Sequence, residues 1–338
     1  PIAMAKPLAF RNVKHRRHIG IGQNIGHGFS NQPVKRLRSA DGRATSGKSQ
    51  KLLRDRLGAL VSPQRLHDTR HDLLDIPTLG VPLDRIDVIQ GDTDKATGGG
   101  SVGSRSLFVG GTAAVVSAGD LIQKAREKAS HVLEASVGDI EYGDGMLTVV
   151  GTDRRVSLFD LAKDEKDSRL TVNSQGDVDG PTWPNGTHIC EVEIDPETGV
   201  TRVVRYTTVD DVGIAINPML VTGQVHGGVA QGIGQALYEG VVYDPSGQLL
   251  TASYQDYCIP RASDMPHVEV TLDDSAPCKT NPLGAKGCGE SGAIGGPPCI
   301  VNGVMDALSE LGITSLQTPL TPVKIWDAIQ KAKATKAA

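Results

Sequence analysis

The chain reads His188-Ile-Cys-Glu-Val-Glu-Ile-Asp195, then Pro-Glu-Thr-Gly199, then Val200-Thr-Arg-Val-Val-Arg-Tyr-Thr-Thr-Val209. The outer two runs are rich in β-branched residues, and the Pro and Gly between them favour a turn. We therefore expect a β-hairpin here. A glycine-interrupted helical pattern follows, from about Met219 to Glu239, so strands and helices are mixed in this part of the chain.

The flanking segments continue this mixture of short strands and helices. Before the hairpin, the patterns predict a strand at Ile86–Ile89, a helix from about Thr112 to Ala135, a hairpin at Ile140–Val150 that turns at Gly143-Asp-Gly145, and a helix at Leu158–Lys163. After it, they predict strands at Gly240–Tyr243, Leu249–Tyr254 and His267–Leu272, and helices near Pro298–Leu311 and Val323–Lys331. Repeated strand–helix–strand units are missing from this order, which favours an α+β fold with mixed sheets and hairpins.

Composition limits the kind of protein. The 338 residues are 38% hydrophobic and 22% charged, as in soluble globular proteins. The chain has 40 glycines and only 4% aromatic residues, so we look for ligands at glycine-rich loops. Its net charge is −4, and we find neither an 18-residue apolar run nor a leader, so we expect a cytoplasmic protein. The five cysteines form no CxxC pair, which argues against a disulfide framework or a structural zinc site.

The N-terminal part differs in character from the rest. Lys35–Asp72 holds ten Lys or Arg against four Asp and no Glu, without a sustained helical or strand period. We therefore separate a partly irregular, basic segment, residues 1–78, from a region 79–338 of two subdomains. Gly42-Arg-Ala-Thr-Ser-Gly47-Lys48-Ser49 matches the phosphate-binding loop of nucleotide hydrolases, but no buried strand precedes it. Nucleotide hydrolysis is therefore a remote alternative.

Two glycine-rich segments predict ligand contacts. In Gly98-Gly-Gly-Ser-Val-Gly-Ser-Arg-Ser106, amides and hydroxyls are spaced to hold an anion such as a pyrophosphate at a helix start, although a flexible loop tip fits as well. In Gly223–Tyr238, each glycine inside the helix costs about 0.5–1 kcal/mol relative to Ala. Close approach of a ligand, with Gln231 as donor and acceptor, or tight helix packing would offset that cost.

A third segment carries a lone carboxylate. Glu290 lies among glycines in Asn281–Pro298, and Lys286 is the nearest cation in the sequence. It can be a solvated or helix-capping residue. If it is buried beside a substrate, its pKa would rise and it could act as a general base.

These three segments, together with Asp210-Asp-Val-Gly-Ile-Ala-Ile-Asn-Pro218, resemble in their order the molybdenum-binding large subunit of the xanthine dehydrogenase, aldehyde oxidase and carbon monoxide dehydrogenase family. The resemblance covers roughly Val81 to Lys331. It implies that molybdopterin, in its cytosine dinucleotide form, is held by Gly103, Ser104, Arg105, Ser106, Gln231, Cys288 and Gly289. It also implies that Glu290 is the catalytic base and that no side chain ligates the metal. Water would supply the oxygen, and electrons would leave through iron–sulfur clusters and FAD on partner subunits.

The chain departs from the family in its first part. Nothing before Val81 resembles the family's other cofactor loops, and the basic stretch Lys35–Asp72 stands where a Gly-Gln-Gly loop is expected; a reading-frame slip would account for it. The resemblance therefore implies half of a subunit, completed by a separate N-terminal half, that hydroxylates a small aldehyde or N-heteroaromatic substrate. A carbon monoxide dehydrogenase and a non-catalytic, degenerate fragment are the alternatives.

Overall fold

A computed structural model describes residues 17–25, 79–81, 92, 94, 100–163 and 170–337. The chain divides into two compact units: unit 1 is Pro1–Val61, Thr182–Pro277 and Lys286–Ala338, and unit 2 is Ser62–Pro181 and Cys278–Ala285. Several predictions lie outside the described residues. They are the basic stretch Lys35–Asp72 with its Gly42–Ser49 motif, the strand Ile86–Ile89, and Gly98 and Gly99.

Unit 1 is built on a four-stranded sheet with the order β1-β5-β6-β7. β1 (Arg17–Ile25), β5 (Asn185–Ile194) and β6 (Thr201–Asp211) are antiparallel neighbours. β7 (Val268–Asp273) runs parallel to β6, which requires a crossover connection; α5 (Pro218–Leu237) lies in that connection. The predicted hairpin, the helix that follows it and the α+β class are confirmed.

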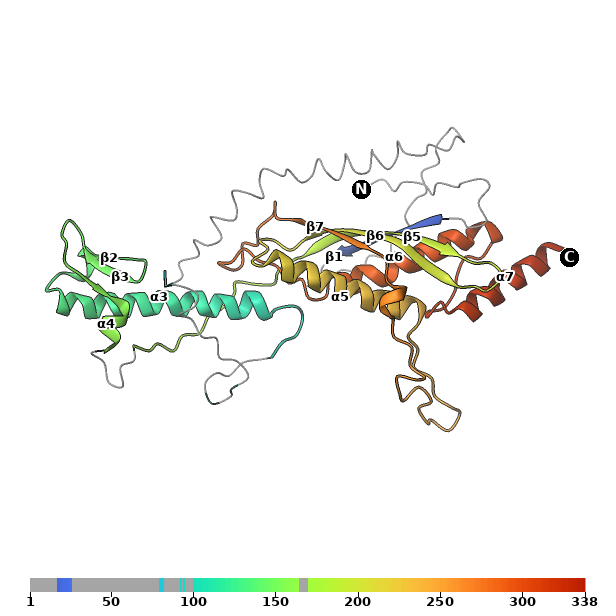
Figure 1. The fold of residues 1–338 in the computed structure, drawn as a ribbon, viewed down its shortest axis with the longest axis horizontal. Helices are drawn as coiled ribbons and strands as arrows, with labels where there is room; N and C mark the ends of the chain where they lie inside the picture. Colours follow the sequence, from blue (N-terminus) through green and yellow to red (C-terminus); the bar gives the residue numbers. More distant parts are fainter. Residues whose placement is uncertain are drawn as a thin grey trace, which may run out of the picture. The chain divides into compact units, whose positions relative to one another are not determined.

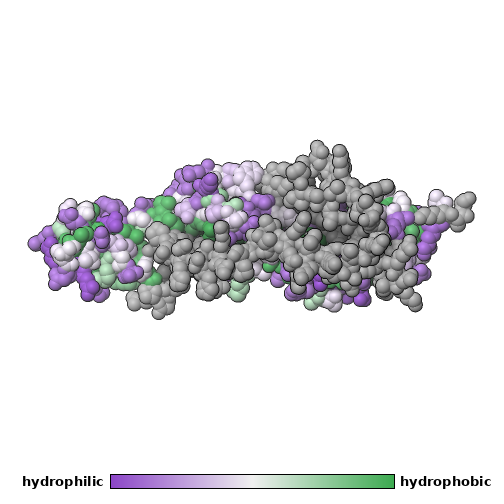
Figure 2. Space-filling view, turned by 90° about the horizontal axis from the view of Figure 1, so that it is seen from above, coloured by the Kyte–Doolittle hydropathy of each residue, from purple (hydrophilic) through white to green (hydrophobic). Residues whose placement is uncertain are grey.

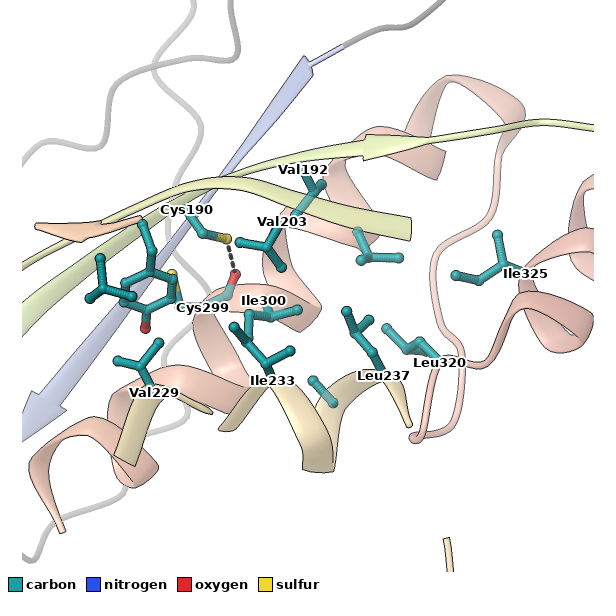
Figure 3. Close-up of a cluster of buried hydrophobic side chains, with 14 of the residues drawn as sticks. Cys190, Val192, Val203, Val229, Ile233, Leu237, Cys299, Ile300, Leu320 and Ile325 are labelled. Carbon is teal, nitrogen blue, oxygen red and sulfur yellow. Dashed lines mark hydrogen bonds between the residues drawn. The ribbon is translucent and has the colours of Figure 1, made fainter. Parts of the chain in front are cut away.

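One face of this sheet is covered by helices. α6 (Ser291–Leu308) packs against β1 and β5, and α5 packs against α6 (Figure 1). Alternate residues of β5 and β6, such as Cys190, Val192 and Val203, point into the core between sheet and helices (Figure 3). The Cys190 thiol donates to the backbone oxygen of Cys299 on α6, at 3.4 Å. α7 (Pro322–Ala337) adds Ile325 and Ile329, one helical turn apart, to the same core.

Glycines let α5 and α6 meet backbone to backbone. A Cβ at Gly228 would lie 2.8 Å from the Cα of Gly292, and a Cβ at Gly232 would lie 2.9 Å from the Cα of Gly296. α6 begins at Ser291, just before Gly292, and contains Pro297 and Pro298. The predicted start near Pro298 was wrong, since tertiary contact stabilises a segment whose composition disfavours a helix.

Unit 2 is a long helix on a small sheet. α3 (Ser106–Val132) buries Ala125 and Ala129 against β2 (Ile140–Gly143), β3 (Met146–Val149), β4 (Arg155–Ser157) and α4 (Leu158–Lys163). The strands are antiparallel neighbours in the order β2-β3-β4. The predicted hairpin and short helix are confirmed. The end of unit 2 that carries β2 and β3 has a largely hydrophilic surface (Figure 2, left).

The first six residues of α3, Ser106 to Gly111, were not predicted as helix. α3 begins at Ser106, not near Thr112, because Gly111 lies against the Leu283 side chain and Ala113 against Gly176. In the part of the chain that the structure describes, α3 alone has the length and apolar composition to cross a membrane. Only 11% of its most apolar 18-residue window is buried. Core helices of soluble proteins meet the same criterion, so this is weak evidence for a span.

The predicted strands at Gly240–Tyr243 and Leu249–Tyr254 were wrong. These residues form a single bridge between Tyr243 and Leu249. The bridge is outside the named strands, so the β-branched and aromatic residues have no larger sheet to join.

Candidate active site

The loop before α3 gathers hydroxyl groups at the start of that helix. Gly103 and Ser104 are consecutive residues with positive φ, 57° and 56°, and the Oγ atoms of Ser101 and Ser106 lie 2.5 Å apart. A Cβ at Gly103 would meet nothing within 4 Å, so the outer side of the loop is open. Positive φ at a residue that is not glycine costs of order 1–3 kcal/mol and is concentrated at ligand-binding sites.

The glycine loop in unit 1 ends on Glu290, the N-cap residue of α6. Glu290 is exposed, and its side chain makes no capping hydrogen bond to the helix. Its carbonyl oxygen accepts from the Ile294 amide at 2.9 Å, and the Ser291 amide donates to Cys288 at 3.1 Å. The structure therefore keeps the backbone of the loop in place without using the carboxylate as a cap.

An ion pair anchors the start of this loop. Lys286 Nζ lies 2.6 Å from Asp211 Oδ2, with the two side chains only 10% and 13% exposed. Asp211 also accepts from Asn185 Nδ2 at 3.1 Å and from the Gly213 amide at 2.9 Å. The Lys286 amide donates to the carbonyl oxygen of Val212 at 2.7 Å. Lys286 is thus paired with β6 through Asp211.

A buried polar chain runs beneath the same loop. The His188 ring lies between the Tyr206 hydroxyl, 2.8 Å from Nδ1, and Asp210 Oδ1, 3.3 Å from Nε2. Thr208 donates to the other Asp210 oxygen at 2.6 Å, and all four residues are fully buried. A Cβ at Gly295 of α6 would lie 2.7 Å from the His188 ring, so the ring packs directly on the helix that Glu290 begins.

Asp210 of this buried polar group also affects the pKa of Cys288. Burial first, and then the charge of Asp210, raise the pKa of the Cys288 thiol. The thiol is therefore neutral near pH 7, and a neutral thiol is a weak nucleophile. Cys288 is half-buried, whereas Gly289 beside it is exposed.

The two faces of α5 differ. Gly228 and Gly232 face α6, whereas Gly227 meets nothing within 4 Å and Gln231 is exposed. Gln224 and Gln235 are exposed too, and their spacing of three or four residues from Gly227 and Gln231 places them on the same side. The helix-packing explanation therefore holds for Gly228 and Gly232. A ligand contact at Gln231, beside the open surface at Gly227, stays a prediction.

A family model described as a molybdopterin cofactor-binding domain matches residues 74–266, more than half of the chain. The chain belongs to this molybdenum-binding family. It is 35% identical over 266 residues to the gamma subunit of the 6-hydroxypseudooxynicotine dehydrogenase complex of Paenarthrobacter nicotinovorans, covering 75% of this chain and 33% of that one. It is 34% identical to the carbon monoxide dehydrogenase large chain of Hydrogenophaga pseudoflava over 285 residues, 82% of this chain and 35% of that one.

Solved structures place the fold in the same molybdopterin-binding family. A Cu,Mo-CO dehydrogenase in its carbon monoxide reduced state matches with a TM-score of 0.69 and 28% identity, over 95% of this chain and 42% of that one. Quinoline 2-oxidoreductase from Pseudomonas putida 86 matches with a TM-score of 0.68 and 28% identity, over 93% and 42%. The chain spans about a third of the length of the curated relatives it matches.

Each unit, taken by itself, presents groups of the kind that bind a phosphate-bearing cofactor. In unit 2, the open loop from Gly103 to Ser106 offers hydroxyls and a helix start to phosphate oxygens. In unit 1, Gln231 and the stretch Cys288–Glu290 reach the surface or lie just beneath it.

Sequence reasoning missed His188 and its partners. His188 and Cys190 share one face of the hairpin, since strand side chains alternate with a period of two. A histidine at a core position of a strand was the available signal.

Proposed function

We propose that the chain forms part of the molybdenum-cofactor subunit of a molybdenum hydroxylase and that Glu290 is its general base. The observation that carries the proposal is the loop ending on Glu290. That loop is held at one end by the partly buried Lys286–Asp211 pair and at the other by α6. The Glu290 carboxylate is exposed and does not cap the helix. A base needs this combination of fixed backbone and accessible carboxylate.

The proposed roles of the site residues are as follows. When bound, the molybdenum and its molybdopterin supply the two-electron oxidation of the substrate. Glu290 takes a proton from the water that supplies the oxygen atom, and Gln231 hydrogen-bonds the cofactor from the open face of α5. Cys288 and Gly289 contact the cofactor beside the base. Gly103, Ser104, Arg105 and Ser106 hold the phosphates of a cytosine dinucleotide form.

Other polypeptide must complete the enzyme. The relatives carry about twice as much further sequence as this chain matches, and their names, a gamma subunit and a large chain, describe parts of complexes. We propose that an N-terminal half, an iron–sulfur subunit and an FAD subunit assemble with it in the cytoplasm. The isolated chain then carries little cofactor and no turnover.

N-heteroaromatic compounds or small aldehydes are the proposed substrates. Support comes from relatives named nicotine 6-hydroxylase large subunit, 36% identical over 271 residues, and quinoline 2-oxidoreductase. Carbon monoxide oxidation is the second candidate, favoured by the match to carbon monoxide dehydrogenase in both sequence and structure.

The test compares wild type and Glu290→Gln in the assembled complex. Glutamine keeps the size of the side chain but cannot accept the proton, so turnover falls ~10²–10⁴-fold or more at equal molybdenum content. Nicotine, quinoline, an aldehyde and carbon monoxide serve as substrates. Turnover of Glu290→Gln within a few-fold of wild type excludes Glu290 as the base, and a complex without molybdenum supports the degenerate-fragment alternative.

A further inference from the structure

The segment between α5 and η4 (Ala262–Asp264) extends away from the core of unit 1. We call residues 240–260 the arm; Figure 1 shows it as a gold-to-orange loop that leaves the helices and returns. The arm displays large apolar side chains to solvent. They are Val241 (60% exposed), Val242 (49%), Tyr243 (61%), Leu250 (52%), Tyr254 (84%) and Ile259 (50%).

The arm has a defined backbone of its own. The Leu250 amide donates to the Val242 carbonyl at 2.8 Å, and the Asp244 amide donates to the Gln248 carbonyl at 2.9 Å. At its base, the Tyr257 hydroxyl donates to Glu239 at 2.6 Å. A two-stranded hairpin is marginally stable alone in water. An arm that holds its shape while exposing six large apolar side chains is therefore built to be covered.

The charges of the arm favour a protein as its binding partner. Residues 240–260 contain two acidic residues, Asp244 and Asp256, and no Lys or Arg. Both carboxylates serve local turns: Asp244 accepts from the Ser246 hydroxyl at 2.6 Å and Asp256 from the Ser253 hydroxyl at 3.0 Å. The arm thus offers no cation to lipid headgroups or to a nucleic acid backbone.

We propose that the arm docks onto the polypeptide that corresponds to the part of the relatives outside this chain's match. This inference rests on the proposed function as part of a larger subunit. The matched region is 33% and 35% of the two relatives described above, so about two thirds of each relative's length lies outside it. In these two relatives the unmatched sequence is part of the same polypeptide and can supply a protein surface to the arm. Tyr243 and Tyr254 are the anchors, because exposed aromatic residues dominate the binding energy of protein interfaces.

Photo-crosslinking in the cells that produce this protein tests the contact directly. The full chain carries benzoylphenylalanine at Tyr254, and a matched chain carries it at Lys331, an exposed residue of α7. The expected product joins position 254 to a polypeptide that aligns with the unmatched part of the Hydrogenophaga carbon monoxide dehydrogenase large chain. A crosslink to a second copy of this chain, a crosslink to lipid, or a yield no higher than at Lys331 overturns the proposal.

Truncation measures the strength of the contact. Tyr254→Ala weakens the affinity for the crosslinked polypeptide by about tenfold or more, with unchanged unfolding of the chain because the side chain is 84% exposed. Gln255→Ala, its polar and exposed neighbour, is the matched control and retains full affinity. Equal affinity of both variants overturns the proposal. Glu290→Gln must assemble normally, so a failed docking site and a failed catalytic base give different results.

Discussion

Breaking the Lys286–Asp211 pair should destabilise the loop that carries the candidate base, Glu290, without changing Glu290 itself. Lys286→Met keeps most of the side-chain volume and leaves Asp211 as a nearly buried, unpaired carboxylate, since the two side chains are 10% and 13% exposed. Removal of one partner of a buried pair costs about 3–5 kcal/mol. Asp211 keeps hydrogen bonds from Asn185 and Gly213 and some solvent contact, so we expect about 2–3 kcal/mol.

Denaturant unfolding of the full chain, followed by circular dichroism, measures this loss. The double variant Lys286→Met/Asp211→Asn should recover part of it, since the unpaired charge is then gone. Lys163→Met is the control, because the Lys163–Asp160 pair is 71% and 58% exposed and its loss should leave the unfolding midpoint unchanged. In the assembled complex, Lys286→Met should lower turnover per molybdenum, and Lys286→Arg should restore it. Unfolding of Lys286→Met within about 0.5 kcal/mol of wild type would refute the anchoring role.

Three further predictions address the cofactor surfaces and the buried thiol. Ser104→Ala/Ser106→Ala should lower the molybdenum content of the complex with unchanged unfolding, since each lost hydrogen bond to a charged group is worth about 1.5–3 kcal/mol; full loading would place the phosphates elsewhere. Gly232→Ala should destabilise the chain by about 1–3 kcal/mol, because its Cβ would lie 2.9 Å from Gly296. Gly227 has open space around it, so Gly227→Ala should stabilise the chain by about 0.5–1 kcal/mol but lower the molybdenum content of the complex. Equal effects of the two variants on unfolding would contradict the assigned faces of α5. Iodoacetamide should label exposed Cys258 before Cys288. The rate of Cys288 alkylation should still rise above pH 9, because the raised pKa of its thiol keeps it protonated at lower pH. Mass spectrometry of the labelled peptides measures both rates.

Local patterns were enough to predict much of the fold. The β5–β6 hairpin, α4 and α5 each have a signal within a few adjacent residues: β-branched runs around a turn, or a helical period. β1 was missed because its partner β5 lies far along the chain, and its pairing of Ile21 with Ile189 leaves no local trace. α6 began earlier than predicted because the contact between Gly228 and Gly292, which composition does not reveal, stabilises its first turn.

The residues of the candidate site also differ in whether a local sequence pattern marks them. Glu290 and the loop from Gly103 to Ser106 could be proposed as site residues because unusual composition marks them in the sequence, and their roles stay predictions. The His188 chain was not found, because it depends on register: His188 pairs with Thr208, which brings Tyr206 and Asp210 to its two sides. Cross-strand neighbours of this kind depend on the pairing of two strands and cannot be read from either strand alone.

The adjacent residues Asp210 and Asp211 show how the sheet holds the backbone near the candidate base, Glu290. Neighbouring side chains of a strand point to opposite faces, so at the end of β6 Asp210 enters the core and Asp211 does not. Asp210 meets His188, whose ring supports α6 at Gly295, and Asp211 holds Lys286. The loop from Gly287 to Glu290 lies between these two attachments. Gly287 is buried and Gly289 is exposed, so the part of the loop next to Glu290 reaches the surface, while contacts with the rigid strand hold the backbone on both sides of the candidate base.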